Sequence, residues 1–160
     1  MVQVLEHIQA TNSYEEERGK PMPSLNHAKL QRNLLFSLAR YAEQYELLPE
    51  IAVKIGDWGA VPDIGIFPLQ NTDFQHDTIK MNTCPLCAIE ILSPTQNLSD
   101  LTEKSEEYFL KGAKSYWLVL PQLQNIYVFN GLFSYTIFQK NDILKDEAMD
   151  IEIDLKKIFK

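Results

Sequence analysis

Apolar residues in this chain follow helical spacing in two stretches, and short strand-like runs fill much of the remainder. In the first stretch, residues 25 to about 47, apolar side chains return every three or four positions, and Ser24 precedes it as a cap. The second stretch runs from about residue 98 to 111 and ends at Gly112. Each predicted helix has one apolar stripe, so we expect both helices to pack against a sheet.

The segment after the first predicted helix contains two strand-like runs and a long polar stretch. Residues 50–55 alternate apolar with polar or small side chains, and a Gly-Asp-Trp-Gly turn leads into a second run at residues 61–67. This order predicts a hairpin. Residues 68–85 are mostly polar and have no clear period, which predicts a long loop, and such loops in compact domains are often functional.

The second half of the chain predicts a strand, helix, strand unit followed by a hairpin. Residues 86–92 and 115–120 are almost continuously apolar, as strands covered on both faces would be. A right-handed crossover through the second helix would make them parallel neighbours. Residues 125–129 and 133–138 flank an Asn-Gly pair, a strong hairpin signal, and residues 151–158 begin with strand-like alternation. These elements together predict an α/β fold.

The bulk properties restrict the class of protein. A chain of 160 residues predicts one domain over residues 1–160. No apolar run reaches the roughly 18 residues needed to cross a bilayer, and no signal-peptide pattern opens the chain, so we expect a cytoplasmic protein without a membrane partner. The net charge of −7 argues against a surface that coats nucleic acid. It does not exclude a nuclease, because carboxylates that bind a divalent cation add negative charge of their own.

The cysteines and two of the histidines are not expected to bind a metal. Cys84 and Cys87 form a lone CxxC, and a zinc site would need two more ligands at suitable spacing, which the chain does not supply. We therefore expect two reduced thiols at the mouth of a strand. His27 in the first helix and His76 in the long loop are expected to be surface residues.

Two acids interrupt otherwise apolar strands, Asp63 at the start of one run and Glu90 late in another. A buried carboxylate that is ionised and unpaired costs several kcal/mol, so each acid needs a compensating partner. If the strands adjoin, both side chains converge, and two carboxylates with waters are enough to hold Mg²⁺. Lys104 lies at the margin of the second helix's apolar face, where its amine would stabilise charge on a phosphate. This combination is typical of phosphodiester hydrolysis.

Each of these residues also has a purely structural interpretation. Asp63 would then cap a turn beside Pro62, and Lys104 would pair with Asp100 one helical turn away. Glu90 is harder to explain in this way, because a lone acid inside an apolar strand rarely serves the fold alone. The three residues together favour the functional interpretation.

Several motifs resemble those of a known family. A Pro-Asp pair followed by an acid in an apolar strand is similar to the PD-(D/E)XK superfamily of nucleases. More narrowly, the chain resembles the bacterial Uma-two family of restriction endonucleases (domain of unknown function eight-twenty) over residues 14 to 138. The segments that carry this resemblance are Pro21-Met22-Pro23-Ser24-Leu25-Asn26-His27, Val61-Pro62-Asp63-Ile64, Ala88-Ile89-Glu90-Ile91-Leu92-Ser93-Pro94-Thr95, Asp100-Leu101-Thr102-Glu103-Lys104, Tyr108, Gly112 and Tyr116-Trp117-Leu118-Val119.

The resemblance implies a restriction-endonuclease-like α/β core, a mixed central sheet flanked by helices, with Asp63 and Glu90 as ligands of Mg²⁺ or Mn²⁺. The superfamily places a lysine two residues after the second acid, and here that position is Leu92. The family supplies a lysine from the following helix, which corresponds to Lys104. A further acid near the N-terminus often completes such sites.

Glu17 is our choice for that further acid because it precedes the turn at Gly19, with Glu15 and Glu16 as competitors. Lys20 occupies the place where some relatives have an acid. The expected reaction is hydrolysis of a DNA phosphodiester by a metal-bound water, with Lys104 near the water or the phosphate.

The expected partner is DNA, although DNA affinity depends on basic residues that neutralise phosphates. Lys20, Lys29, Arg32 and Arg40 lie on or near the first helix and form the candidate basic patch, although they do not all share one face. A homodimer would bring two sites to two strands. Two alternatives stay open: a nuclease-fold module of weak or no activity that binds DNA or a protein, and a metal-dependent hydrolase of another phosphoester.

Overall fold

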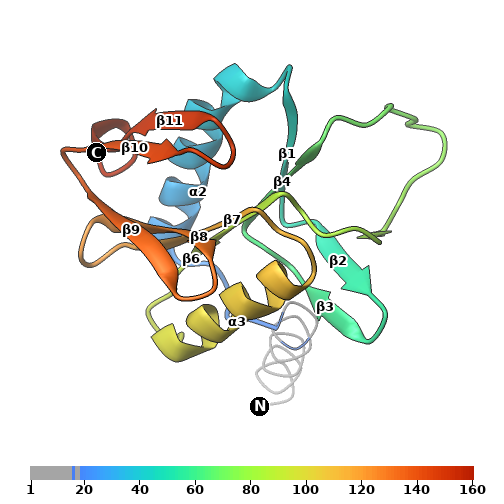
Figure 1. Ribbon diagram of the computed structural model, residues 1–160, viewed down its shortest axis with the longest axis horizontal. Helices are drawn as coiled ribbons and strands as arrows, with labels where there is room; N and C mark the ends of the chain where they lie inside the picture. Colours follow the sequence, from blue (N-terminus) through green and yellow to red (C-terminus); the bar gives the residue numbers. More distant parts are fainter. Residues whose placement is uncertain (1–15, 17–18) are drawn as a thin grey trace, which may run out of the picture.

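A mixed six-stranded sheet forms the centre of the computed structural model, which describes residue 16 and residues 19–160 (Figure 1). All neighbouring strands are antiparallel except β6 and β7, which run parallel. The predicted mixed α/β architecture is therefore confirmed. In spatial order the strands are β1 (Tyr45–Pro49), β4 (Ile64–Pro68), β6 (Cys87–Ile91), β7 (Ser115–Leu120), β8 (Asn125–Gly131) and β9 (Ser134–Gln139).

The two predicted helices cover opposite faces of this sheet (Figure 1). Helix α2 (Leu25–Leu38) begins at Ser24, whose side chain accepts a hydrogen bond from the His27 backbone amide, as the cap prediction requires. Helix α3 (Leu98–Leu110) is followed by Gly112, whose φ of +109° is a conformation that favours glycine.

The predicted length of the first helix was wrong. Helix α2 ends at Leu38, a short 3₁₀ turn, η1 (Ala39–Tyr41), follows, and the chain then enters β1. The spacing of Tyr41 and Tyr45 fits a helix, but Tyr45 is the first residue of a strand that pairs with β4 along its whole length. Tertiary pairing with β4 therefore overrides the local period.

The predicted hairpin between residues 50–55 and 61–67 was also wrong. Strand β2 (Ala52–Ile55) turns back through β3 (Trp58–Ala60), and both belong to a separate three-stranded sheet with β5 (Lys80–Met81), a short strand inside the predicted loop. Strand β4 instead pairs with β1 and β6. Its residues 64–67 are all buried, so β4 fits the middle of the sheet better than a two-stranded hairpin.

The predicted strand, helix, strand unit is confirmed. Strands β6 and β7 are parallel neighbours in which every residue is buried, and α3 connects them. The hairpin of β8 and β9 is also present, but Gly131 still belongs to β8 and the turn falls at residues 132–133. Trp117 is completely buried in the core.

The C-terminal region forms a hairpin of β10 (Ile143–Asp146) and β11 (Ile151–Asp154), followed by the 3₁₀ turn η2 (Leu155–Lys157). The sequence predicted only the second of these strands. The hairpin packs beside α2 (Figure 1), and its apolar residues join the core on that face.

Asp146 joins this hairpin to the central sheet. It is 2% exposed, its Oδ2 accepts hydrogen bonds from Ser115 Oγ and from Trp117 Nε1 (2.6 Å), and its Oδ1 accepts one from the Met149 amide (3.2 Å). We expect Asp146→Ala to lower the free energy of unfolding by about 3 kcal/mol or more, because it leaves several buried donors unpaired. Urea unfolding measures this loss.

The control for that prediction is Asp142→Ala, which removes an exposed carboxylate that accepts a single backbone hydrogen bond. Its expected loss is at most about 1 kcal/mol. Equal losses for the two variants would mean that Asp146 does not anchor the hairpin.

Candidate active site

The two acids singled out in the sequence lie side by side in the central sheet. Strands β4 and β6 are antiparallel with Ile64 opposite Ile89, so the next position of the same register places Asp63 beside Glu90. Both residues have 0% of their surface exposed. The expectation that these strands adjoin and bring the acids together is therefore confirmed.

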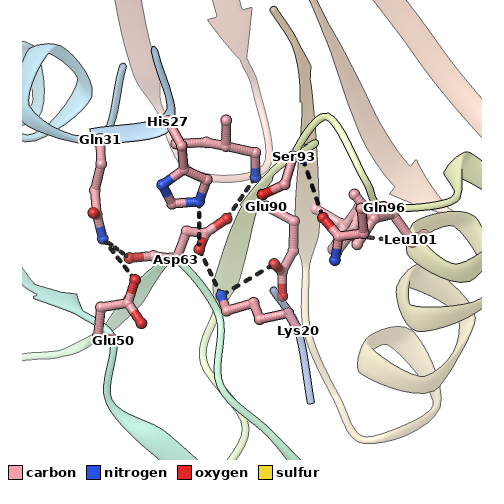
Figure 2. A network of polar contacts seen from close by, with 11 residues as sticks. Lys20, His27, Gln31, Glu50, Asp63, Glu90, Ser93, Gln96 and Leu101 are labelled. Atoms are coloured by element: carbon pink, nitrogen blue, oxygen red, sulfur yellow. Dashed lines mark hydrogen bonds and ion pairs between the residues drawn. The ribbon is translucent and has the colours of Figure 1, made fainter. Parts of the chain in front are cut away.

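Asp63 is held by three groups that are distant in the sequence (Figure 2). Its Oδ1 lies 2.5 Å from Lys20 Nζ and 2.9 Å from His27 Nε2, and its Oδ2 accepts a hydrogen bond of 2.7 Å from the Ile91 amide. Burial opposes ionisation, but the hydrogen bond from His27 and the charge of Lys20 outweigh it and lower the pKa of Asp63 to about 2. Asp63 is thus an ionised carboxylate, and it does more than cap a local turn.

The pKa of Glu90 is shifted in the opposite direction, and its oxygens have fewer contacts. Both of its carboxylate oxygens are buried and have no hydrogen-bond donor within the described part of the chain, and Oε2 lies 3.6 Å from Lys20 Nζ. Burial, with a smaller contribution from the charge of Asp63, raises the pKa of Glu90 to about 7, although Lys20 and Lys104 oppose this rise. Glu90 is therefore a carboxylate that additional positive charge would stabilise.

Lys20 is the nearest cation to both acids, and the sequence interpretation of it was wrong. We expected it in a surface basic patch, but its side chain is 3% exposed and points between Asp63 and Glu90 (Figure 2). Burial disfavours its charged form, but the negative charges of Glu90 and Asp63 outweigh this and raise its pKa. The only signal in the sequence was the family resemblance, which implies an acid at this position in some relatives.

The N-terminal part of α2 supplies further contacts to Asp63. His27, expected at the surface, is 2% exposed, and Gln31 Nε2 donates to the Asp63 backbone carbonyl at 2.8 Å and to Glu50 Oε1 at 3.3 Å. Residues four apart share one face of a helix, so His27 and Gln31 reach the same acid. The spacing was visible in the sequence, but the direction of this face was not.

Lys104 lies on α3 and is half-buried. Among the described residues it has no ion pair within 4 Å, so it pairs neither with Asp100 nor directly with the two acids. Its charge nevertheless acts on Glu90 and lowers the pKa of that residue. The catalytic role predicted for Lys104 stays a prediction.

The remaining residues singled out in the sequence are an N-terminal acid, the candidate basic patch, the second histidine and the two cysteines. Glu17 lies outside the described residues. Lys29, Arg32 and Arg40 are exposed, as the basic patch requires, and His76 is an exposed residue that pairs with a neighbour in its own loop. The thiols Cys84 and Cys87 are unpaired with each other, and Cys87 is fully buried in β6.

The donor set fits a divalent cation, with one obstacle. No group of three or more His, Cys, Asp or Glu residues suited to a metal occurs within the described ranges. Two carboxylates nevertheless lie side by side, and the oxygens of Glu90 accept no hydrogen bond from any residue that the structure describes. Carboxylate oxygens suit Mg²⁺ and Mn²⁺, and Mg²⁺ often keeps only one or two protein carboxylates. The obstacle is the ammonium of Lys20, which already lies between the two acids.

These two acids predict an unusual pH dependence of stability for the metal-free protein. Glu90 has a pKa of about 7 in the fold against 4.5 ordinarily, so the fold keeps a proton that the unfolded chain loses, and stability falls as pH rises between these values, by at most about 3 kcal/mol. Asp63, with a pKa of about 2 against 3.8, stabilises the fold above its ordinary pKa and loses this effect as pH falls. Stability should be greatest at about pH 4 to 5.

Unfolding in urea at a series of pH values, with EDTA present, measures this profile. Glu90→Gln cannot titrate and should remove most of the decline between pH 5 and 7. If the variant keeps the full decline, another group is responsible.

No helix in the described residues is long and apolar enough to span a membrane. No curated protein matches the chain. A solved structure titled a putative nuclease belonging to DUF820, from Anabaena variabilis, has a TM-score of 0.76 and 21% identity, and the match covers 87% of this chain and 83% of that chain. The similarity confirms the fold.

The family follows from the sequence. The model of the Uma2 family, described as "Putative restriction endonuclease", matches residues 11–152. This range includes Lys20, His27, Asp63, Glu90 and Lys104. Because the match covers most of the chain, the protein belongs to the Uma2 family, as its motifs predicted.

Proposed function

We propose that this protein is a metal-dependent nuclease that hydrolyses DNA phosphodiester bonds at Asp63 and Glu90. The observation that carries the proposal is the meeting of two completely buried carboxylates from adjacent strands, one of which has no hydrogen-bond donor among the described residues. Such a pair is costly for the fold alone, because two carboxylates must lose their hydration together and their negative charges repel each other. Carboxylates whose pKa values are strongly shifted, as both of these are, cluster at functional sites.

In this proposal each residue of the site has a distinct task. A divalent cation held between Asp63 and Glu90 would activate water and neutralise charge on the phosphate. His27 and the Ile91 amide fix the orientation of Asp63, and His27 together with the charge of Lys20 keeps it ionised. Glu90 offers a cation two oxygens that accept no hydrogen bond from the described residues.

The amines of Lys20 and Lys104 are the two candidates for contact with the scissile phosphate. Lys20 carries a positive charge that already touches an acid, whereas Lys104 acts on Glu90 from α3 over a longer distance. Removal of the amine that contacts the phosphate should lower the rate of cleavage without loss of DNA affinity of similar size.

DNA would approach along the basic residues of the first helix. Lys29 and Arg32 lie on α2, and Arg40 lies in the turn after it; all three are exposed. Because the net charge is −7, phosphate contacts must come from such a local patch. Binding should therefore weaken steeply with salt concentration.

A second candidate function is a nuclease-fold module that binds DNA or a protein partner without cleavage. The specific observation that favours it is the position of Lys20, whose ammonium fills the space between the acids while both acids are completely buried. A site closed in this way binds no substrate unless Lys20 withdraws.

DNA cleavage by the wild-type protein distinguishes the two functions. Supercoiled plasmid and fluorescently labelled single-stranded DNA and RNA are incubated with Mg²⁺, with Mn²⁺ or with EDTA. Cleavage that needs the metal supports the nuclease. If the protein binds DNA in a gel-shift assay but cleaves no substrate under all of these conditions, the binding module is supported and the proposal is overturned.

A further inference from the structure

The Lys20 ammonium contacts Asp63 directly and lies within ion-pair distance of Glu90. Its Nζ lies 2.5 Å from Asp63 Oδ1 and 3.6 Å from Glu90 Oε2, and the side chains of all three residues are at most 3% exposed. Figure 2 shows the amine pointing between the two acids from the opposite side to His27. Within the described part of the chain, the Lys20 amine is the only ion-pair partner of Glu90 within 4 Å.

A divalent cation bound by both acids would need the same space. Mg²⁺ lies about 2.1 Å from its oxygen ligands, which is close to the separation of Lys20 Nζ from Asp63 Oδ1. An ammonium and a divalent ion cannot occupy one position, and two cations in neighbouring positions repel each other. In a buried site little water is present to screen this repulsion. The two cations therefore exclude each other.

We propose that Lys20 is a built-in counterion that competes with the divalent cation for Asp63 and Glu90, so that metal binds only when the Lys20 side chain leaves the pair. This inference rests on the proposed metal-dependent function. It goes further, because it assigns to one residue of this chain the control of metal affinity.

The location of Lys20 in the fold is consistent with such a movement. The residue lies in the segment that precedes α2, next to Gly19, and belongs to no helix or strand. Gly19 has a φ of +66°, and a Cβ added there would meet nothing within 4 Å, so this turn is open to solvent. A lysine side chain rotates about four bonds and can move its amine without a shift of the sheet that carries the acids.

The test is a titration of the metal-free protein with Mn²⁺ alone. Calorimetry measures the heat of binding, and the electron paramagnetic resonance signal measures the free Mn²⁺. Lys20→Met keeps an unbranched side chain one atom shorter and removes its charge, and should bind Mn²⁺ at least tenfold more tightly than wild type. Lys20→Arg keeps the charge and should retain the weak wild-type affinity. Lys140→Met, an exposed lysine in the turn after β9, is the matched control and should behave as wild type.

The site of this binding is checked by a double variant. Lys20→Met combined with Asp63→Asn should lose the gain in Mn²⁺ affinity, because one of the two carboxylates is gone. If Lys20→Met unfolds, Lys20→Gln replaces it. In the variant that folds, Mn²⁺ should raise the melting temperature by more than it does in the wild type.

Equal or weaker Mn²⁺ binding by Lys20→Met and Lys20→Gln would overturn the competition. Metal-dependent DNA cleavage by the wild type together with that result would reject only the competition and leave the proposed nuclease in place. Tighter binding by the variants without cleavage by any protein would establish the competition and reject the nuclease.

Discussion

Asp63→Asn abolishes metal-dependent DNA cleavage and destabilises the protein; this is the largest effect that we expect from a single substitution. The asparagine has almost the same size, but it carries no charge to balance Lys20, and it has one acceptor oxygen in place of the two that contact Lys20, His27 and the Ile91 amide. Removal of one partner of a buried ion pair costs about 3 to 5 kcal/mol, because the other charge stays buried. Loss of one metal ligand should lower cleavage by about 100-fold or more.

Two measurements separate these effects. Urea unfolding gives the loss of stability, and cleavage is then measured at a temperature where circular dichroism shows the variant to be folded. Asp57→Asn is the matched control, since Asp57 is exposed in the turn between β2 and β3, and it should change neither quantity appreciably. A folded Asp63→Asn protein that cleaves at the wild-type rate would remove Asp63 from the active site.

Glu90→Gln should also abolish cleavage, but with a much smaller loss of stability. The substitution keeps the volume of the side chain and removes a carboxylate that has no hydrogen-bond donor in the described structure and whose pKa burial raises to about 7. At pH 8 the wild type bears the cost of an ionised buried acid, and the neutral amide does not. We expect cleavage to fall by about 100-fold or more, while the unfolding free energy of the variant at this pH is either higher than that of the wild type or lower by no more than about 1 kcal/mol.

The contrast between the two variants is diagnostic. Glu107→Gln, the same change at an exposed position of α3, is the control and should leave cleavage and stability unchanged. If Glu90→Gln cleaves normally, the pair of acids does not form the active site. If it loses as much stability as Asp63→Asn, then Glu90 acts chiefly as the structural partner of Lys20.

Asp63 and Glu90 could be selected from the sequence because acids in apolar strands are conspicuous. An acid among isoleucines needs a physical reason wherever the strand is placed, and that reason does not depend on the neighbouring strands. The strand, helix, strand unit of β6, α3 and β7 was predictable for a related reason, since continuous apolar runs identify strands buried on both faces.

Lys20 and His27 could not be assigned in this way. A lysine after a glycine and a histidine in the first turn of a helix are usual at a surface, and nothing local distinguishes these two from surface residues. Their burial follows from the way in which α2 and the segment before it pack onto the ends of β4 and β6. Pairing over distances of 36 and 43 residues along the chain is a property of the whole fold.

The partners of the strands show the same limit. Tyr45 continues the helical period of α2, yet it begins β1, because pairing with β4 covers an edge that no local pattern records. The run from residue 61 seemed to complete a hairpin, yet β4 lies between β1 and β6. Sequence period identifies which segments are apolar on one face or two, but partners are chosen by the burial of the whole sheet.

The sequence by itself therefore determined the α/β class, the family and the two acids of the candidate site, because periodicity, motif spacing and the cost of buried charge act locally. Only the tertiary structure decided which cation compensates those acids. It placed Lys20 there, and it left Lys104 on α3 without a direct contact to them. The physical reason is that an ion pair depends on distances of a few ångströms between side chains, and these distances are set by packing rather than by sequence spacing.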